Sequence, residues 1–175
     1  MKQKTEIQLC ISFMELLRKC PFPKITIQKI AQQCGVNRQT FYYHFDNIYD
    51  LMAKAFEYEL IHESGMQEAV SWESVMRYFL CWMRDNKNIM KNILTNVEVG
   101  YLRRAIYPLV ASVMASEHRF GVINKTDSEQ NKEFVQHFLT LGLTQYVLEW
   151  AENDFREEVD DMISELFWLF KKIYG

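Results

Sequence analysis

The chain has 175 residues, of which 49% are hydrophobic and 14% aromatic, so it can bury a core. This composition excludes a disordered protein. No run of about 18 apolar residues occurs, which excludes a membrane span. Six glycines and three prolines are few for this length and favour long helices. We therefore expect an all-α fold of one or two small domains.

The formal charge of −3 is unevenly distributed along the chain. Residues 1–55 hold eight Lys and Arg against four Asp and Glu, a net charge of +4. The rest of the chain holds 12 against 19, a net charge of −7. This division indicates that only the N-terminal part binds a polyanion.

Cysteines and histidines give no sign of a metal site or a disulfide. The four cysteines show no CxxC motif and no ligand-like spacing: Cys10, Cys20, Cys34 and Cys81. We expect them to be reduced and mostly buried, as in the cytoplasm. The N-terminus MKQKTEIQ has no apolar run, so no signal peptide is expected. Three histidines are too far apart for a metal site, and no cofactor is expected: His62, His118 and His137.

The first predicted helix runs from about Thr5 to Arg18 or Lys19. Thr5 and Gln8 have the spacing of a capping box. Pro21-Phe22-Pro23 should stop the helix, because proline lacks the N–H and disfavours helix in the residue before it. Apolar residues follow a helical period between these limits: Ile7, Cys10, Ile11, Phe13, Met14 and Leu17.

Residues 26–44 predict two short helices around a sharp turn. Thr26 and Asn37 are good N-caps for the two helices. Gly35 stands between them, where a helix end needs a residue that tolerates left-handed backbone. Such an arrangement is the helix-turn-helix plan for binding the major groove of DNA. The first of these helices should bury Ile27, Ile30, Ala31 and Cys34.

The second helix of this motif should carry the groove-reading side chains. At 100° per residue, Phe41 and Phe45 turn inward with Val36. Arg38 can pair with guanine or phosphate, and Gln39 with adenine. The outward set is Arg38, Gln39, Tyr42 and Tyr43.

Further side chains at the edges of the motif should contact phosphate. Thr40 and His44 lie at the flanks of the second helix, and Thr26 and Gln28 open the first. The first predicted helix of the chain should pack over the two helices of the motif and complete a three-helix N-terminal head. Packing inside this head stays the alternative for Tyr43 and His44. The expected partner is double-stranded DNA with a pseudo-palindromic operator.

A fourth helix should link this head to the rest of the chain. We expect Asp46 to cap it and Ser64-Gly65 to end it. The predicted division is therefore a DNA-binding domain at 1–46, a linker helix at 47–63 and a helical regulatory and dimerisation domain at 64–175. The buried side of the linker should be Ile48, Leu51, Met52, Ala55, Phe56 and Leu60.

The body should begin at Ser71, an N-cap for a helix from Trp72 to about Asn86. A short helical segment at 88–94 and a longer one at 97–120 should follow. Pro108 predicts a kink or break near Tyr107 in the longer one. A loop at 121–125 then precedes a capping box of Thr126 and Glu129, which opens a helix to about Glu152.

The last two helices are the most apolar. The helix that ends near Glu152 is apolar on nearly all sides from Phe134 onward, so it must be covered on all sides. Gly142 in its middle suggests a close backbone approach. The final helix, expected to be capped near Asp154 with Glu157 behind, has a broad apolar stripe. We predict a homodimer through these two helices, and an ordinary monomer core is the alternative.

The stretch ITIQKIAQQCGVNRQTFYYHFDNIYDLMAKAF resembles the signature of the TetR family of bacterial transcriptional regulators. The resemblance covers about residues 5–62, and the body is similar in plan, with a weaker likeness to regulators of dihydroxyacetone-kinase operons. It implies a helical body with a ligand pocket. One departure is that Ile48 and Tyr49 stand where many relatives carry a phosphate-contacting lysine. A plain core position is the first interpretation of each of the following residues, and lining the pocket is the alternative: Trp72, Phe79, Trp82, Met83, Tyr101, Tyr107, His137 and Tyr146.

The expected function is a dimeric DNA-binding regulator, a repressor that an unknown small-molecule effector releases. The alternative is a regulator, either an activator or a repressor, whose body docks a partner protein. An enzyme is not expected, because the chain has no GxGxxG, P-loop, HExxH or nucleophile motif.

Overall fold

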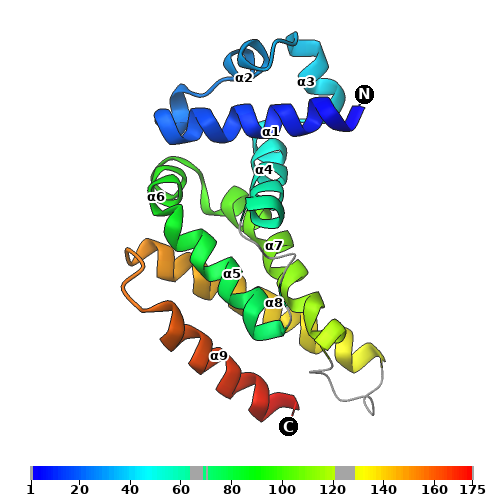
Figure 1. The fold of residues 1–175 in the computed structure, drawn as a ribbon, viewed down its shortest axis with the longest axis vertical. Coiled ribbons are helices and arrows are strands. Elements are labelled where there is room, and N and C mark those ends of the chain that lie inside the picture. The colour runs from blue at the N-terminus through cyan, green and yellow to red at the C-terminus, as the bar shows by residue number, and fades with distance from the viewer. Residues whose placement is uncertain (1, 64–68, 70, 121–128, 175) are drawn as a thin grey trace.

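A computed structural model describes residues 2–63, 69, 71–120 and 129–174, and every regular element within them is a helix. The all-α prediction is thus confirmed. Figure 1 shows a small N-terminal head at one end, with α4 leading from it into a larger body. None of the helices in the described ranges is long and apolar enough to cross a membrane.

The head consists of α1 (Lys2–Lys19), the short 3-10 helix η1 (Phe22–Lys24), α2 (Ile27–Gln33) and α3 (Arg38–His44). Helix α1 packs against α2, and α2 against α3. Phe13, Ile30 and Phe41 are fully buried between them. The predicted start of α1 is wrong: Thr5 and Gln8 lie inside a helix that already begins at Lys2, since Lys and Gln are good helix formers.

Helix α4 (Ile48–Glu63) connects the two parts, because it packs on α1 at one end and on α7 in the body. Its predicted buried side is confirmed, with Leu51, Met52, Ala55 and Phe56 fully buried. The predicted cap is wrong by one residue. Asn47, and not Asp46, accepts from the backbone N–H groups of Tyr49 and Asp50.

The body begins with α5 (Trp72–Asp85), α6 (Lys87–Asn96) and α7 (Val99–Phe120). Ser71 caps α5 as predicted, in a reciprocal box with Ser74. The break predicted at Pro108 is wrong, since α7 continues through it. Proline removes the hydrogen bond to the carbonyl of Arg104. Both residues are exposed, so water can satisfy that carbonyl while the neighbouring residues stay packed in the core.

The body ends with α8 (Glu129–Glu152) and α9 (Val159–Tyr174). The predicted cap of α9 at Asp154 is wrong. Asp154 and Phe155 have left-handed backbone, with φ of 64° and 56°, and form the corner after α8. Asp tolerates this conformation, whereas for Phe155 it costs about 1–2 kcal/mol. The buried Phe155 ring packs edge-on against Trp150, with ring centroids 4.8 Å apart, and thereby offsets the strain.

Three predictions fall wholly or partly on residues outside the described ranges. They are the end of the linker at Ser64-Gly65, the loop at 121–125, and the capping box of Thr126 with Glu129.

Candidate nucleic-acid interface

The turn between α2 and α3 is built by local hydrogen bonds. Thr26 has extended backbone, and its hydroxyl accepts from the backbone N–H of Lys29 at 3.2 Å. After α2, Gly35 has a φ of 72°, the left-handed value that its position requires. The backbone N–H of Val36 then donates to Ala31 at 2.9 Å and closes the turn. Both predicted features of the turn, the Thr26 cap and the left-handed Gly35, are confirmed.

Helix α3 is fixed at its start and from below. The Asn37 side chain accepts from the backbone N–H of Thr40 at 2.8 Å, so the predicted cap is confirmed. The Thr40 hydroxyl also donates to Asn37 Oδ1, at 3.0 Å. Phe41 and Phe45 are buried, with ring centroids 5.7 Å apart, as the helical period predicted. The outer face of α3 therefore has a fixed orientation on the head.

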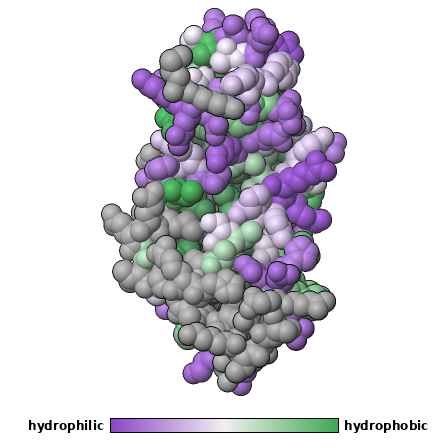
Figure 2. Space-filling model, turned by 90° about the vertical axis from the view of Figure 1, so that its right-hand side faces the viewer, coloured by the Kyte–Doolittle hydropathy of each residue, from purple (hydrophilic) through white to green (hydrophobic). Residues whose placement is uncertain are grey.

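The outer face carries the predicted groove-reading side chains. Arg38, Gln39, Tyr42 and Tyr43 are all exposed, with Tyr43 at 67%. The Arg38 guanidinium lies over the Tyr42 ring, 5.4 Å from its centroid, and donates to its hydroxyl at 3.0 Å. This contact holds the two donors beside each other before any DNA is bound. Figure 2 shows hydrophilic side chains over much of the head on the face that it presents.

His44 does not lie on the exposed outer face of α3. Its side chain is only 3% exposed, and Nδ1 is 3.9 Å from a carboxylate oxygen of Glu6 in α1. The ring packs edge-on against Tyr43, with centroids 5.3 Å apart. This placement agrees with the alternative that His44 packs inside the head. Thr26 and Gln28, at the start of α2, are exposed as a phosphate contact requires.

The eight pocket candidates do not meet in one place. Phe79 and Met83 are fully buried in the core, and Trp72 packs on Phe170 with ring centroids 4.4 Å apart. Trp82 lies at a cleft of about 580 Å³ formed by α1, α4 and α5. The other candidates make pairwise contacts: Tyr101 stacks on Tyr49, Tyr107 hydrogen-bonds to His137, and Tyr146 donates to Glu165. Their role in ligand binding stays a prediction.

An apolar surface lies at the other end of the molecule, on α8 and α9. Here the expectation that α8 is covered on all sides is wrong for the single chain. Phe134 and Phe138 on α8 are 68% and 64% exposed, and Trp168 on α9 is 63% exposed. Gly142 is exposed too, and nothing lies within 4 Å of the position that a Cβ would take, so it makes no close approach within this chain.

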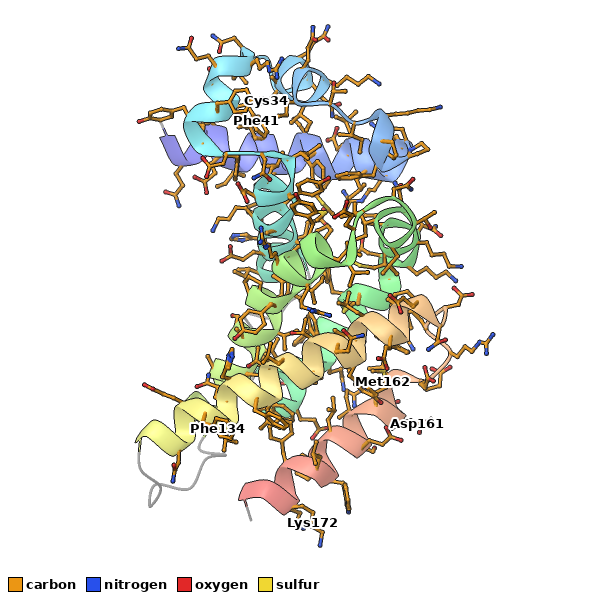
Figure 3. The ribbon with its side chains drawn as sticks, turned by 180° about the vertical axis from the view of Figure 1, so that it is seen from behind. Cys34, Phe41, Phe134, Asp161, Met162 and Lys172 are labelled. Atoms are coloured by element: carbon orange, nitrogen blue, oxygen red, sulfur yellow. The ribbon has the colours of Figure 1, made fainter. Side chains whose placement is uncertain are left out.

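Phe138, Gly142 and Trp168 border a groove of about 800 Å³ between the two helices. Helix α9 packs mainly on α5, where Arg84 pairs with Glu158 at 3.1 Å. Across the groove, the Tyr146 hydroxyl donates to Glu165 at 3.0 Å. Burial and this carboxylate raise the pKa of Tyr146 to about 12. Figure 3 shows α8 and α9 diverging, with Phe134 near one end of α8 and Lys172 near the end of α9.

The thiols and acidic side chains show no second site. No group of His, Cys, Asp and Glu in the described ranges could hold a metal ion. The four cysteines are free, and burial raises the pKa of Cys10 to about 12.

Asn92 was missed by the sequence reasoning. The only signal was an asparagine among the apolar residues of a helix, and its hydrogen bonds join the head to the body.

Two family models match the chain. One, described as bacterial regulatory proteins of the tetR family, matches residues 14–55. The other, described as a transcriptional regulator C-terminal region, matches residues 70–172. No curated protein matches the sequence.

Several solved structures share the fold. The dihydroxyacetone kinase operon activator DhaS is 18% identical, with a TM-score of 0.59 over 98% of each chain. FadR of Thermus thermophilus, a repressor in complex with lauroyl-CoA, is 18% identical, with a TM-score of 0.60 over 94% of this chain and 92% of that one. A TetR regulator from Streptococcus agalactiae 2603V is 21% identical, with a TM-score of 0.57 over 99% and 96%.

Proposed function

Because the chain belongs to the TetR family of bacterial transcriptional regulators, we propose that it is a homodimer that represses transcription at a specific DNA site until a small ligand releases it. The observation that carries the DNA-binding role is the outer face of α3. Arg38, Gln39 and Tyr42 are exposed there, on a helix that Phe41 anchors and Asn37 caps. Helix α3 has seven residues, about 10 Å of helix, which fits a major groove about 12 Å wide.

A dimer explains the apolar surface of α8 and α9. Exposed phenylalanine and tryptophan side chains beside a groove favour an interface, since monomers rarely expose large contiguous apolar patches. A second copy related by two-fold symmetry would place the same surface against itself. The two heads would then bind half-sites about 34–36 Å apart on one face of the DNA. A ligand that favours another head spacing would lower the affinity for that site.

The ligand of the body can be tested by its chemical class. FadR of Thermus thermophilus holds lauroyl-CoA, which makes an acyl-CoA the first probe to try here. The expected result is that lauroyl-CoA raises the Kd for operator DNA. If it and other acyl chain lengths leave the Kd unchanged, this ligand class is wrong.

The packing of the body supports a second candidate function, in which the body docks a partner protein. Phe79 and Met83 are fully buried among other side chains, so they do not line an open cavity. The fold is also shared with DhaS, which is named an activator and not a repressor. A body that stays filled in a crystal structure, together with no response to small ligands, would favour this function.

The first experiment is a gel-shift titration with the DNA upstream of the chain's own gene. We expect binding that weakens as salt rises, because Lys and Arg contacts release counterions from phosphate. Failure to bind any promoter-region DNA at low salt would overturn the proposal.

Two variants then test how the contacts divide. Gln39→Ala should change the preferred base at one position, at a cost of about 1–3 kcal/mol for the preferred site. Thr26→Ala should weaken all sites alike, because it removes the cap of α2 and a phosphate contact. Thr26→Ser, which keeps the hydroxyl, is the matched control. Identical site preferences in all variants would show that Gln39 does not read a base.

A further inference from the structure

Asn92 of α6 joins the body to the head through three hydrogen bonds. Its Nδ2 donates to the backbone carbonyl of Leu17 at 3.1 Å and to that of Cys20 at 2.9 Å. Its Oδ1 accepts from the backbone N–H of Phe22 at 2.9 Å. Asn92 is half-buried, and these three partners lie between the last turn of α1 and the first residue of η1.

The sequence explains why this amide is needed there. In a continuing α-helix, the carbonyl of Leu17 would accept from the N–H of residue 21. Residue 21 is proline and has no N–H, so that carbonyl lacks its intrahelical partner. The carbonyl of Cys20 and the N–H of Phe22 lie beyond the helix end and also need partners. An asparagine side chain has donors and an acceptor, so one residue of the body serves all three groups.

Aromatic stacking holds the same corner from the other side. The buried Phe22 ring lies nearly parallel to Tyr49 of α4, with centroids 5.9 Å apart. Tyr49 in turn stacks on Tyr101 of α7, with centroids 3.8 Å apart and an interplanar angle of 10°. The proline-bounded corner is thus tied to α6 by hydrogen bonds and to α4 and α7 by ring contacts.

We propose that these four residues, Asn92, Phe22, Tyr49 and Tyr101, form a clamp that sets the angle of the DNA-binding head on the body. Asn92 is its positioning residue. A displacement of α6 or α7 passes through the clamp to η1 and so to α1 and α2. The regulatory part of this inference rests on the proposed function. It also gives Tyr49 a role where relatives carry a phosphate-contacting lysine: in this chain the position packs between head and body.

The alternative is that Asn92 only caps α1 and stabilises the fold. A cap contributes to the melting temperature, whereas a clamp also restricts the orientation of the head. The test is therefore the distribution of head–body distances in the full-length protein. Spin labels at Gln32 on α2 and Glu152 on α8, both exposed, are introduced through non-natural amino acids so that the native cysteines stay unmodified. Labelled chains are diluted with unlabelled chains, so that the distance reports on a single chain.

We expect one narrow distance distribution for the wild type and a broader one for Asn92→Ala and for Tyr49→Ala. Asn88→Ala is the matched control, one turn earlier on α6 and exposed, and Tyr49→Phe keeps the ring stack. Both controls should keep the narrow distribution. If Asn92→Ala does not fold, Asn92→Asp retains the size and the acceptor for Phe22 but loses both donors.

DNA binding gives a second readout. If the competent orientation falls to about a tenth of the population, the Kd for the operator rises about tenfold. Unchanged distance distributions in Asn92→Ala and Tyr49→Ala would overturn the clamp, even if the melting temperature falls. A wild-type chain that binds no DNA would instead refute the proposed function and leave the distance test of the clamp intact.

Discussion

The head and the far end of the body differ in how completely they bury their own apolar side chains. In the head, Phe13, Ile30 and Phe41 have no exposed surface, although α2 and α3 have only seven residues each. At the far end, Phe138 and Trp168 are mostly exposed on helices of 24 and 16 residues. Helix length and apolar content therefore do not decide which part of the molecule buries its apolar side chains.

This contrast agrees with the proposed dimer. In the head, the outer face of α3 exposes polar and aromatic side chains, which suits a surface that meets DNA. The end formed by α8 and α9 leaves apolar area in water, at a cost of about 25 cal/mol for each Å². Substitutions at Phe138, Phe41 and Tyr146 test this contrast between the head and the end formed by α8 and α9.

Phe138→Glu should have the largest effect, because it places a charge on the apolar surface beside the groove. We expect monomers in analytical ultracentrifugation and an operator affinity about 10³-fold lower, since one head alone loses the avidity of two. Val99→Glu is the control, an exposed apolar residue on α7 that lies away from this surface. A Phe138→Glu dimer with normal operator affinity would show that α8 is not the interface.

Phe41→Leu should have an intermediate effect that is confined to the head. Removing part of a fully buried ring should lower the free energy of unfolding by about 1.5 kcal/mol. Tyr42→Leu, at the exposed neighbour, should change it by less than about 0.5 kcal/mol. Denaturant unfolding measures the free energy of unfolding. Ultracentrifugation at the same protein concentration measures whether the dimer remains. Loss of the dimer in Phe41→Leu would contradict the independence of the two parts.

Tyr146→Phe should have the smallest effect. It removes the hydrogen bond to Glu165 across the groove, which is worth about 0.5 kcal/mol at a partly exposed site. The pKa of Tyr146 in the folded protein is raised to about 12, above the ordinary value of about 10 for tyrosine. The stabilisation by its hydrogen bond is therefore fully present below pH 10 and is lost as pH rises toward 12.

Denaturant unfolding of Tyr146→Phe and the wild type at several pH values checks this expectation. The free energy of unfolding of the wild type minus that of Tyr146→Phe should be constant up to about pH 9 and fall as the pH rises above 10, because the unfolded wild-type chain loses the Tyr146 proton more readily than the folded one. A constant difference across that range would show that the hydroxyl does not make this bond in solution.

The head could be predicted well because its signals are local. The caps at Thr26 and Asn37 and the left-handed Gly35 each depend on a few neighbouring residues, and all were confirmed. His44 shows the limit of such reasoning. Helical period placed it at a flank, but Glu6 and the rest of α1, far away in sequence, determine that its side chain is buried.

The body could be predicted less well, because contacts between residues far apart in the sequence decide the features that were predicted wrongly. The break at Pro108 did not occur, since the residues around it pack on other helices. Asp154 was predicted to cap the start of α9. It instead follows α8, where it pairs with Lys91 of α6 at 2.6 Å. Composition showed that α8 is apolar, but Phe134 and Phe138 stay exposed in the part of the chain that the structure describes.

The unbroken length of α4 has a mechanical consequence for the whole molecule. A helix of 16 residues is about 24 Å long, and one end lies under the head while the other is packed in the body. It acts as a lever: a tilt of about 5° at the inner end moves the outer end by about 2 Å over that length. Two such levers in a symmetric pair would double the change in span. In the proposed dimer, a small repacking inside the body would therefore change the distance between the two α3 helices.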